Sequence, residues 1–140
     1  MKILFLDCDG VINNEKSFKD EPIDPIDQVL ANRIKVIQLL TGCGIVLSSV
    51  WRNSPELVAK VEEKIGKVFG VTPNATDPNR SERGDEIAMW LEAHPGVKKY
   101  AILDDDLDIL LEQIPNFFNT SFKLGITENT MFKVISHLNY

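Results

Sequence analysis

Short runs of apolar and β-branched residues alternate along this chain with amphipathic segments of helical length. The pattern predicts strands at Lys2–Cys8, Gly44–Ser49, Lys67–Thr72, Tyr100–Asp104 and Asn116–Thr120. It predicts helices at Asp27–Leu40, Ser54–Ile65, Gly84–Ala93, Leu107–Gln113 and Glu128–Leu138. Strands that are apolar throughout and are joined by helices are typical of a parallel sheet covered on both faces. We therefore expect an α/β fold, a Rossmann-like three-layer sandwich with about five strands.

Polar side chains follow three of these strands at the points where the strands end. They are Asp7 and Asp9, Ser48 and Ser49, and Asp104 and Asp105. Ligands of open parallel sheets bind beyond the carboxyl ends of the strands, near the point where the strand order reverses. An acidic cluster at that edge is repulsive unless a cation neutralises it. The sequence therefore predicts a site at this edge of the sheet.

The segment Asp7-Cys8-Asp9-Gly10 carries the most specific chemistry. Strand periodicity places the two aspartates on one side of the chain, and Gly10 permits a sharp turn or a close approach to a ligand. One carboxylate can serve as nucleophile and metal ligand, while the other protonates a leaving oxygen and then activates water. An ordinary aspartate turn that caps nearby amides is the alternative interpretation.

The segment ILFLDCDGVI resembles the first motif of the haloacid dehalogenase (HAD) superfamily. Two later segments resemble further motifs of that family: IVLS, ending at Ser48, and AILDD, ending at Asp104 and Asp105. The resemblance implies a compact HAD-like phosphatase in which Asp7 is the nucleophile and Asp9 the acid and base. It also implies a Mg²⁺ ion held by Asp7, Asp9, Asp104 and Asp105. Ser48, or its neighbour Ser49, would donate a hydrogen bond to the phosphoryl group.

The family also uses a basic residue near the start of a later helix to bind the phosphoryl group. Arg83 stands in that place, and Arg80 is an alternative three residues earlier. A further cation, Arg52, follows the second motif in a Ser-x-Trp-Arg pattern. This pattern resembles a subset of compact HAD proteins that includes phosphatase-like domains linked to RNA repair. Arg52 is predicted either to bind substrate phosphate or to pair with a neighbouring acid, with Trp51 as packing.

The gaps between the motifs are too short for an inserted cap domain, so we expect one domain over residues 1–140. The segments Asn13–Pro25 and Pro73–Glu82 remain as loops around the site. By analogy with the family, an open site suits a bulky or macromolecular phosphorylated substrate, whose identity the sequence does not indicate.

A net charge of −6 and a pI of about 4.9 argue against general nucleic-acid binding and against binding to membrane surfaces. The sequence shows no apolar run of membrane-spanning length and no signal-peptide cleavage site, which favours the cytoplasm. The oligomeric state is not indicated.

Taken together, these features predict a magnesium-dependent, HAD-type phosphoric monoester hydrolase that acts through an aspartyl-phosphate. One alternative is a HAD-fold binding module without catalysis, although both aspartates of the first motif are present. A less favoured alternative is a receiver-like phosphoacceptor domain. That domain needs an aspartate at the end of its third strand, and the segment KVFGVT has none.

Overall fold

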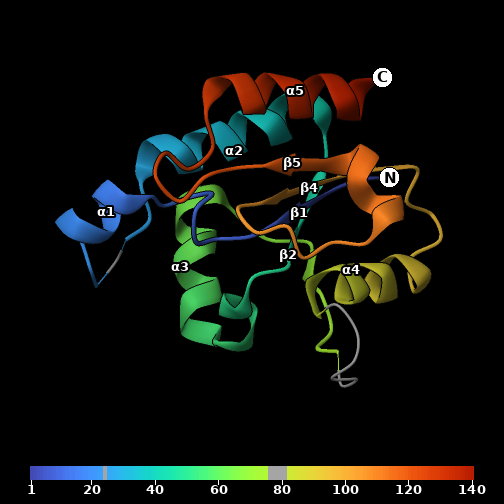
Figure 1. The fold of residues 1–140 in the computed structure, drawn as a ribbon, viewed down its shortest axis with the longest axis horizontal. Coiled ribbons are helices and arrows are strands. Elements are labelled where there is room, and N and C mark those ends of the chain that lie inside the picture. Colours follow the sequence, from blue (N-terminus) through green and yellow to red (C-terminus); the bar gives the residue numbers. More distant parts are fainter. Residues whose placement is uncertain (24, 76–81) are drawn as a thin grey trace.

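The computed structural model describes residues 1–23, 25–75 and 82–140 (Figure 1). Five parallel strands form one sheet in the order β3-β2-β1-β4-β5. The strands are β1 (Lys2–Leu6), β2 (Gly44–Leu47), β3 (Gly70–Val71), β4 (Lys99–Asp104) and β5 (Phe117–Asn119). The α-helices are α1 (Glu15–Asp20), α2 (Gln28–Thr41), α3 (Pro55–Ile65), α4 (Glu82–Glu92) and α5 (Glu128–Asn139). Two 3₁₀-helices are η1 (Val50–Asn53) and η2 (Leu111–Asn116).

Helices cover both faces of the sheet, as Figure 1 shows with α2 and α5 on one side and α4 on the other. Successive residues of β1 point to opposite faces, because the side-chain period of a strand is two. Leu4 and Leu6 belong to the larger core, which also holds the buried residues of α2, α3 and α5. Phe5 lies in the smaller core, with Ile87 and Trp90 of α4. The expected three-layer α/β fold is confirmed.

Local signals define the starts of two helices that the sequence predicted closely. The Asp27 side chain accepts hydrogen bonds from the first amides of α2, which ends at Gly42 with a φ of 71°. The Ser54 side chain caps α3, whose first residue is Pro55. These two helices start within one residue of their predicted positions.

The chain after β4 differs from the prediction. The helix expected at Leu107–Gln113 is wrong, because η2 begins only at Leu111. The Gln113 side chain accepts from the Leu110 amide and donates to the carbonyl of Gly84 in α4. A Cβ on Gly84 would lie 2.8 Å from the Leu110 nitrogen, so this loop packs directly on the backbone of α4. Tertiary contacts therefore override the helical pattern of this segment.

Helix α1 was not predicted at all. This helix of six residues begins with a capping box. The Asn14 side chain accepts a hydrogen bond from the Ser17 amide, and the Ser17 side chain accepts one from the Asn14 amide. So short a helix carries no readable periodicity and depends on its cap and its packing. It occupies part of the segment Asn13–Pro25 that was predicted as a loop.

No helix within residues 1–23, 25–75 and 82–140 combines the length and the apolar character that crossing a membrane requires.

Candidate active site

The predicted site residues converge at the carboxyl edge of the sheet. The Asp7 amide donates to the Leu103 carbonyl of β4 over 3.0 Å, and the Ser48 amide donates to the Leu6 carbonyl of β1 over 3.0 Å. These bonds continue the sheet pairing beyond the strands, so the residues that follow β1, β2 and β4 are held together. In the strand order, β1 and β4 flank the point where the chain crosses from one half of the sheet to the other. This is where open α/β sheets bind ligands.

Three carboxylates form a compact cluster at this edge. Asp7, Asp104 and Asp105 each offer an oxygen atom, and these atoms lie within 4.8 Å of one another. Asp7 is 6% exposed and Asp104 only 1%. Hard oxygen donors at this spacing are the ligands that Mg²⁺ prefers. The donor set therefore fits the metal that the sequence predicted.

The electrostatics of the cluster also favour a cation. Burial, and then the neighbouring Asp104 carboxylate, raise the pKa of Asp7 from 3.8 to about 8, although Arg83 acts in the opposite direction. Burial and Asp104 likewise raise the pKa of Asp105. The ionised carboxylates are thus destabilised by one another and by the loss of water, and a bound cation would relieve both effects.

Arg83 is the cation that the structure brings to the cluster. It is the second residue of α4, and its Nη1 contacts an Asp104 carboxylate oxygen directly and lies 3.3 Å from Asp7 Oδ1. Burial lowers the pKa of Arg83, but Asp104 and Asp7 more than offset that effect, so the pKa is raised overall. The Arg83 amide also donates to Asp108 Oδ2 over 3.2 Å. Arg80, the sequence alternative, lies outside the described residues.

The two adjacent serines have different surroundings, although both are buried. Ser49 Oγ accepts from the Trp51 amide over 3.1 Å and begins η1. Ser48 Oγ is buried and has no hydrogen-bond partner among the residues that the structure describes. A buried hydroxyl without a partner costs about 1–3 kcal/mol, and such groups in folded proteins call for an explanation such as a missing ligand. This arrangement favours Ser48 over Ser49 as the group that meets a substrate oxygen.

A comparison with protein-family models adds the decisive observation. The model for the HAD domain in Swiss Army Knife RNA repair proteins matches residues 3–131 of the chain. The chain belongs to this HAD domain family. The match spans every motif discussed above and supports a phosphatase-like or RNA repair-related function. A search of curated proteins found no match, and neither did a search of solved structures.

Asp9 is not one of the three carboxylates whose oxygen atoms form the cluster of this HAD domain. Its Oδ1 atom accepts from Asn13 Nδ2 over 2.9 Å, and the residue is partly exposed. The next residue, Gly10, has a φ of 79°, and a Cβ there would overlap the Asp105 carboxylate. The structure therefore groups Asp7 with Asp104 and Asp105, while one oxygen of Asp9 is bonded to Asn13.

Arg52 lies in a buried network that joins three segments. Its Nε donates to the Thr72 carbonyl, its Nη1 to the Ser49 carbonyl and its Nη2 to Asn74 Oδ1, each over 2.9 Å. The same Nη2 lies 3.0 Å from a carboxylate oxygen of Glu86 in α4. Burial lowers the pKa of Arg52, and Glu86 partly offsets this effect. The geometry thus matches the ion-pair alternative for Arg52, and all three guanidinium nitrogens are already engaged.

Trp51 lies within the larger core and is 9% exposed, which agrees with its expected packing role. Together with Arg52 it fixes the turn that follows the second motif. Trp51 and Arg52 of the Ser-x-Trp-Arg pattern therefore help to hold Ser48 in place, because they fix the turn that follows it.

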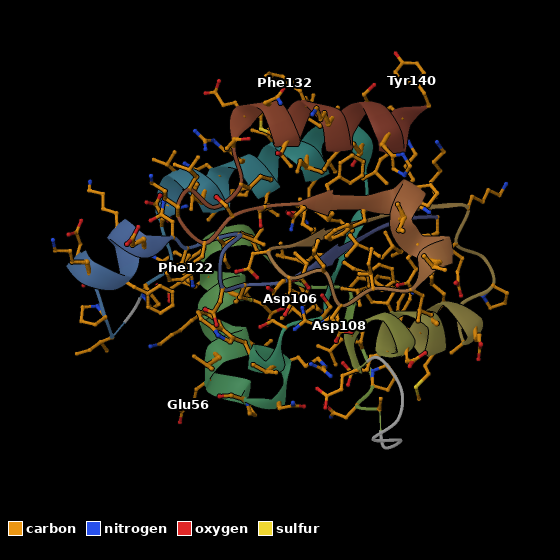
Figure 2. All side chains as sticks on the ribbon, viewed as in Figure 1. Glu56, Asp106, Asp108, Phe122, Phe132 and Tyr140 are labelled. Atoms are coloured by element: carbon orange, nitrogen blue, oxygen red, sulfur yellow. The ribbon has the colours of Figure 1, made fainter. Side chains whose placement is uncertain are left out.

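A pocket of about 200 Å³ adjoins the cluster at Arg83. It is lined by Val50, Arg52, Asn74, Glu82, Arg83, Glu86, Asp106 and Asp108. Asp106 and Asp108, labelled in Figure 2, belong to the loop that follows β4. A larger pocket of about 400 Å³ lies near Gly44 and Phe69, at the start of β2 and before β3, and contains none of the predicted site residues.

Sequence reasoning missed two residues that shape this edge, Asn13 and Glu86. A signal for Glu86 was present, because it stands three residues after Arg83 and so shares its face of the helix. Asn13 is a fully buried polar residue that directly follows the apolar pair Val11 and Ile12. Its partners could not be read from the sequence, since they depend on the conformation of the turn.

Proposed function

We propose that this HAD domain is a magnesium-dependent phosphatase that hydrolyses a phosphate monoester through an aspartyl-phosphate on Asp7. The observation that carries the proposal is the cluster of Asp7, Asp104 and Asp105, with oxygen atoms within 4.8 Å of one another and Arg83 against two of the three carboxylates. A candidate nucleophile, a cation and a set of oxygen ligands thus occur together at the carboxyl edge of the sheet.

In the first half of the reaction, an oxygen of Asp7 attacks phosphorus in line with the bond to the leaving group. The new bond joins the Asp7 oxygen to phosphorus, and the bond from phosphorus to the substrate oxygen breaks. Asp9 gives its proton to that departing oxygen. Arg83 and the Ser48 hydroxyl donate hydrogen bonds to the phosphoryl oxygens and stabilise their charge.

In the second half, the ionised Asp9 takes a proton from a water molecule as that water attacks phosphorus. The bond between phosphorus and Asp7 breaks, which releases inorganic phosphate and restores both carboxyl groups. A magnesium ion held by Asp7, Asp104 and Asp105 would favour the ionised form of Asp7 and would draw charge from the phosphoryl oxygens.

We further propose that the substrate is a macromolecule with a terminal phosphate, and that an RNA end is the first candidate. The family description, a HAD domain in RNA repair proteins, supports this choice. The net charge of −6 provides no general attraction to a polynucleotide backbone. Recognition would then be confined to the terminal phosphate and the groups next to it.

The proposal is tested by comparing the wild type with Asp7→Asn on p-nitrophenyl phosphate, with and without magnesium. We expect magnesium-dependent hydrolysis by the wild type and a loss of about a thousandfold or more in the variant. Asp27→Asn is the matched control, because Asp27 caps α2 with an oxygen that asparagine retains. Comparable rates for the wild type and Asp7→Asn would contradict the role of Asp7.

A panel of phosphorylated sugars, nucleotides, peptides and RNA ends then tests the substrate class. A preference of about tenfold or more in kcat/KM for RNA ends over mononucleotides is the expected result. Magnesium binding without turnover of any compound would favour the alternative of a binding module.

A further inference from the structure

Asn13 forms a bridge within the turn that carries Asp9. Its Oδ1 accepts from the Gly10 amide over 2.8 Å, and its Nδ2 donates to Asp9 Oδ1 over 2.9 Å. The Asn13 side chain is fully buried, at 0% exposed. Figure 1 shows this turn between β1 and α1, which begins one residue after Asn14. Both polar atoms of the Asn13 amide are therefore used at the site itself.

The turn has other supports that do not involve Asn13. The Val11 and Ile12 amides donate to the Cys8 carbonyl over 3.1 and 3.0 Å. The Thr120 hydroxyl donates to the Gly10 carbonyl over 2.6 Å. Because these bonds already close the turn, the bond from Asn13 to Asp9 is not needed to form it. What that bond adds is a fixed orientation of the Asp9 carboxyl group.

We infer that Asn13 is a positioning residue that directs the proton-transferring oxygen of Asp9 toward the leaving group. This inference rests on the proposed phosphatase function. The Asn13 N–H occupies Asp9 Oδ1, which leaves Oδ2 as the oxygen that transfers the proton. Oδ2 delivers that proton to the substrate oxygen as the bond to phosphorus breaks, and it later receives one from the attacking water. The proton that Asp9 gives to the leaving group is replaced by the proton that it takes from water, so each turnover restores Asp9 without another donor or acceptor.

The variant Asn13→Asp removes the N–H that Asp9 accepts and puts a second carboxyl group beside it, whereas Asn13→Ser removes the N–H without adding a charge. Asn13→Asp keeps an oxygen that can accept from the Gly10 amide, but it has no N–H to offer Asp9. The control is Asn14→Asp, which introduces the same change one residue later. The Asn14 side chain caps α1, a role that aspartate also fills. Asn13→Ser, which introduces no charge, is the second variant should Asn13→Asp fold poorly.

The assay compares two monoesters of similar size, p-nitrophenyl phosphate and benzyl phosphate. Nitrophenolate departs readily as an anion, whereas the benzyl alkoxide needs a proton, so only the second substrate depends strongly on a well-placed acid. For Asn13→Asp we expect kcat/KM on benzyl phosphate, which reports the reaction up to departure of the leaving group, to fall by about tenfold or more, a part of the 10²–10⁴-fold that general acid catalysis supplies. On p-nitrophenyl phosphate kcat/KM should fall by less than about threefold, whereas kcat can fall on both substrates because hydrolysis of the aspartyl-phosphate needs Asp9 in either case. Asn14→Asp should match the wild type on both.

A readout that does not depend on activity completes the test. Because the Asn13 side chain bonds to Gly10 and Asp9 and belongs to none of the three clustered carboxylates, magnesium should raise the melting temperature of Asn13→Asp as it does that of the wild type. An equal loss of kcat/KM on both substrates, or no loss of kcat/KM on benzyl phosphate, would overturn the inference while the phosphatase function stands. A wild type inactive on both substrates would instead refute the proposed function, and the inference with it.

Discussion

Replacing Ser48 with alanine should make the protein more stable and less active at the same time. The Ser48 hydroxyl is buried without a hydrogen-bond partner in the described part of the chain. A buried, unsatisfied hydroxyl costs about 1–3 kcal/mol, and alanine removes it with little change in shape. We therefore expect the free energy of unfolding of the ligand-free protein to rise by about 1 kcal/mol, or about 2–4 °C in melting temperature.

The same substitution should lower kcat, because the Ser48 hydroxyl is proposed to donate a hydrogen bond to a phosphoryl oxygen. Removal of one such donor lowers kcat by about a hundredfold in well-studied sites. Ser49→Ala provides the matched comparison one residue away. Ser49 Oγ accepts from the Trp51 amide over 3.1 Å, so its loss should lower the free energy of unfolding by about 1 kcal/mol. The rate should then change by less than about threefold.

The assay combines thermal unfolding followed by circular dichroism with steady-state hydrolysis of p-nitrophenyl phosphate. Both serines are at most 1% exposed, so solvent exposure does not distinguish them. The reasoning fails if Ser48→Ala is less stable than the wild type, since the hydroxyl would then have a partner in the resting protein. It also fails if Ser49→Ala, and not Ser48→Ala, loses activity.

Three further predictions concern the same edge. Gly10→Ala should destabilise the protein more than Gly42→Ala. Both glycines have a positive φ, but of the two only Gly10 would place the added Cβ against another residue, the Asp105 side chain. Thermal unfolding of the two variants checks this order. Arg52→Met should lower the free energy of unfolding by about 3–5 kcal/mol, since it leaves the Glu86 carboxylate buried without its cation. Glu86→Gln should cost less, and a urea titration showing the reverse order would contradict the network. The pKa of Asp7 is raised, so this carboxyl binds its proton more tightly in the folded protein, and the stability that it contributes to the metal-free fold should be lost as the pH rises from 3.8 through about 8. Stabilisation by magnesium should consequently be larger at about pH 8 than at about pH 6, and a smaller shift at the higher pH would count against the metal cluster.

The sequence predicted the sheet well because each strand is a short apolar run with a clear end. Asp7 and Asp104 could be placed together for the same reason, since parallel strands bring their carboxyl ends to one edge. Caps such as Asp27 and Ser54 fixed two helix starts through bonds to residues only two or three positions away. All of these signals are local, and local signals can be read from a single chain.

Helix α1 was missed because its six residues carry no periodicity, although its capping box is local. The other differences arose where distant residues decide the conformation. The loop after β4 is held by Gln113 against Gly84, which is 29 residues away in the chain. Arg52 pairs with Glu86, so the choice between a phosphate ligand and an ion pair depends on how α4 packs. The difference between Ser48 and Ser49 likewise depends on partners that only the folded chain supplies. The motifs therefore identified the residues of the site. The surroundings of each residue depend on packing between distant segments, which the sequence did not reveal.

Trapping the phosphoryl group on Asp7 would test directly whether Asp7 is the nucleophile. Asp9→Asn should still accept phosphate from p-nitrophenyl phosphate, whose leaving group needs no proton, but it should hydrolyse the intermediate slowly. Mass spectrometry of the digested protein, quenched in acid during turnover with magnesium, should find one added phosphoryl group on the peptide that contains Asp7. Release of nitrophenolate with no phosphoryl group on that peptide, or with the group on another peptide, would contradict the account.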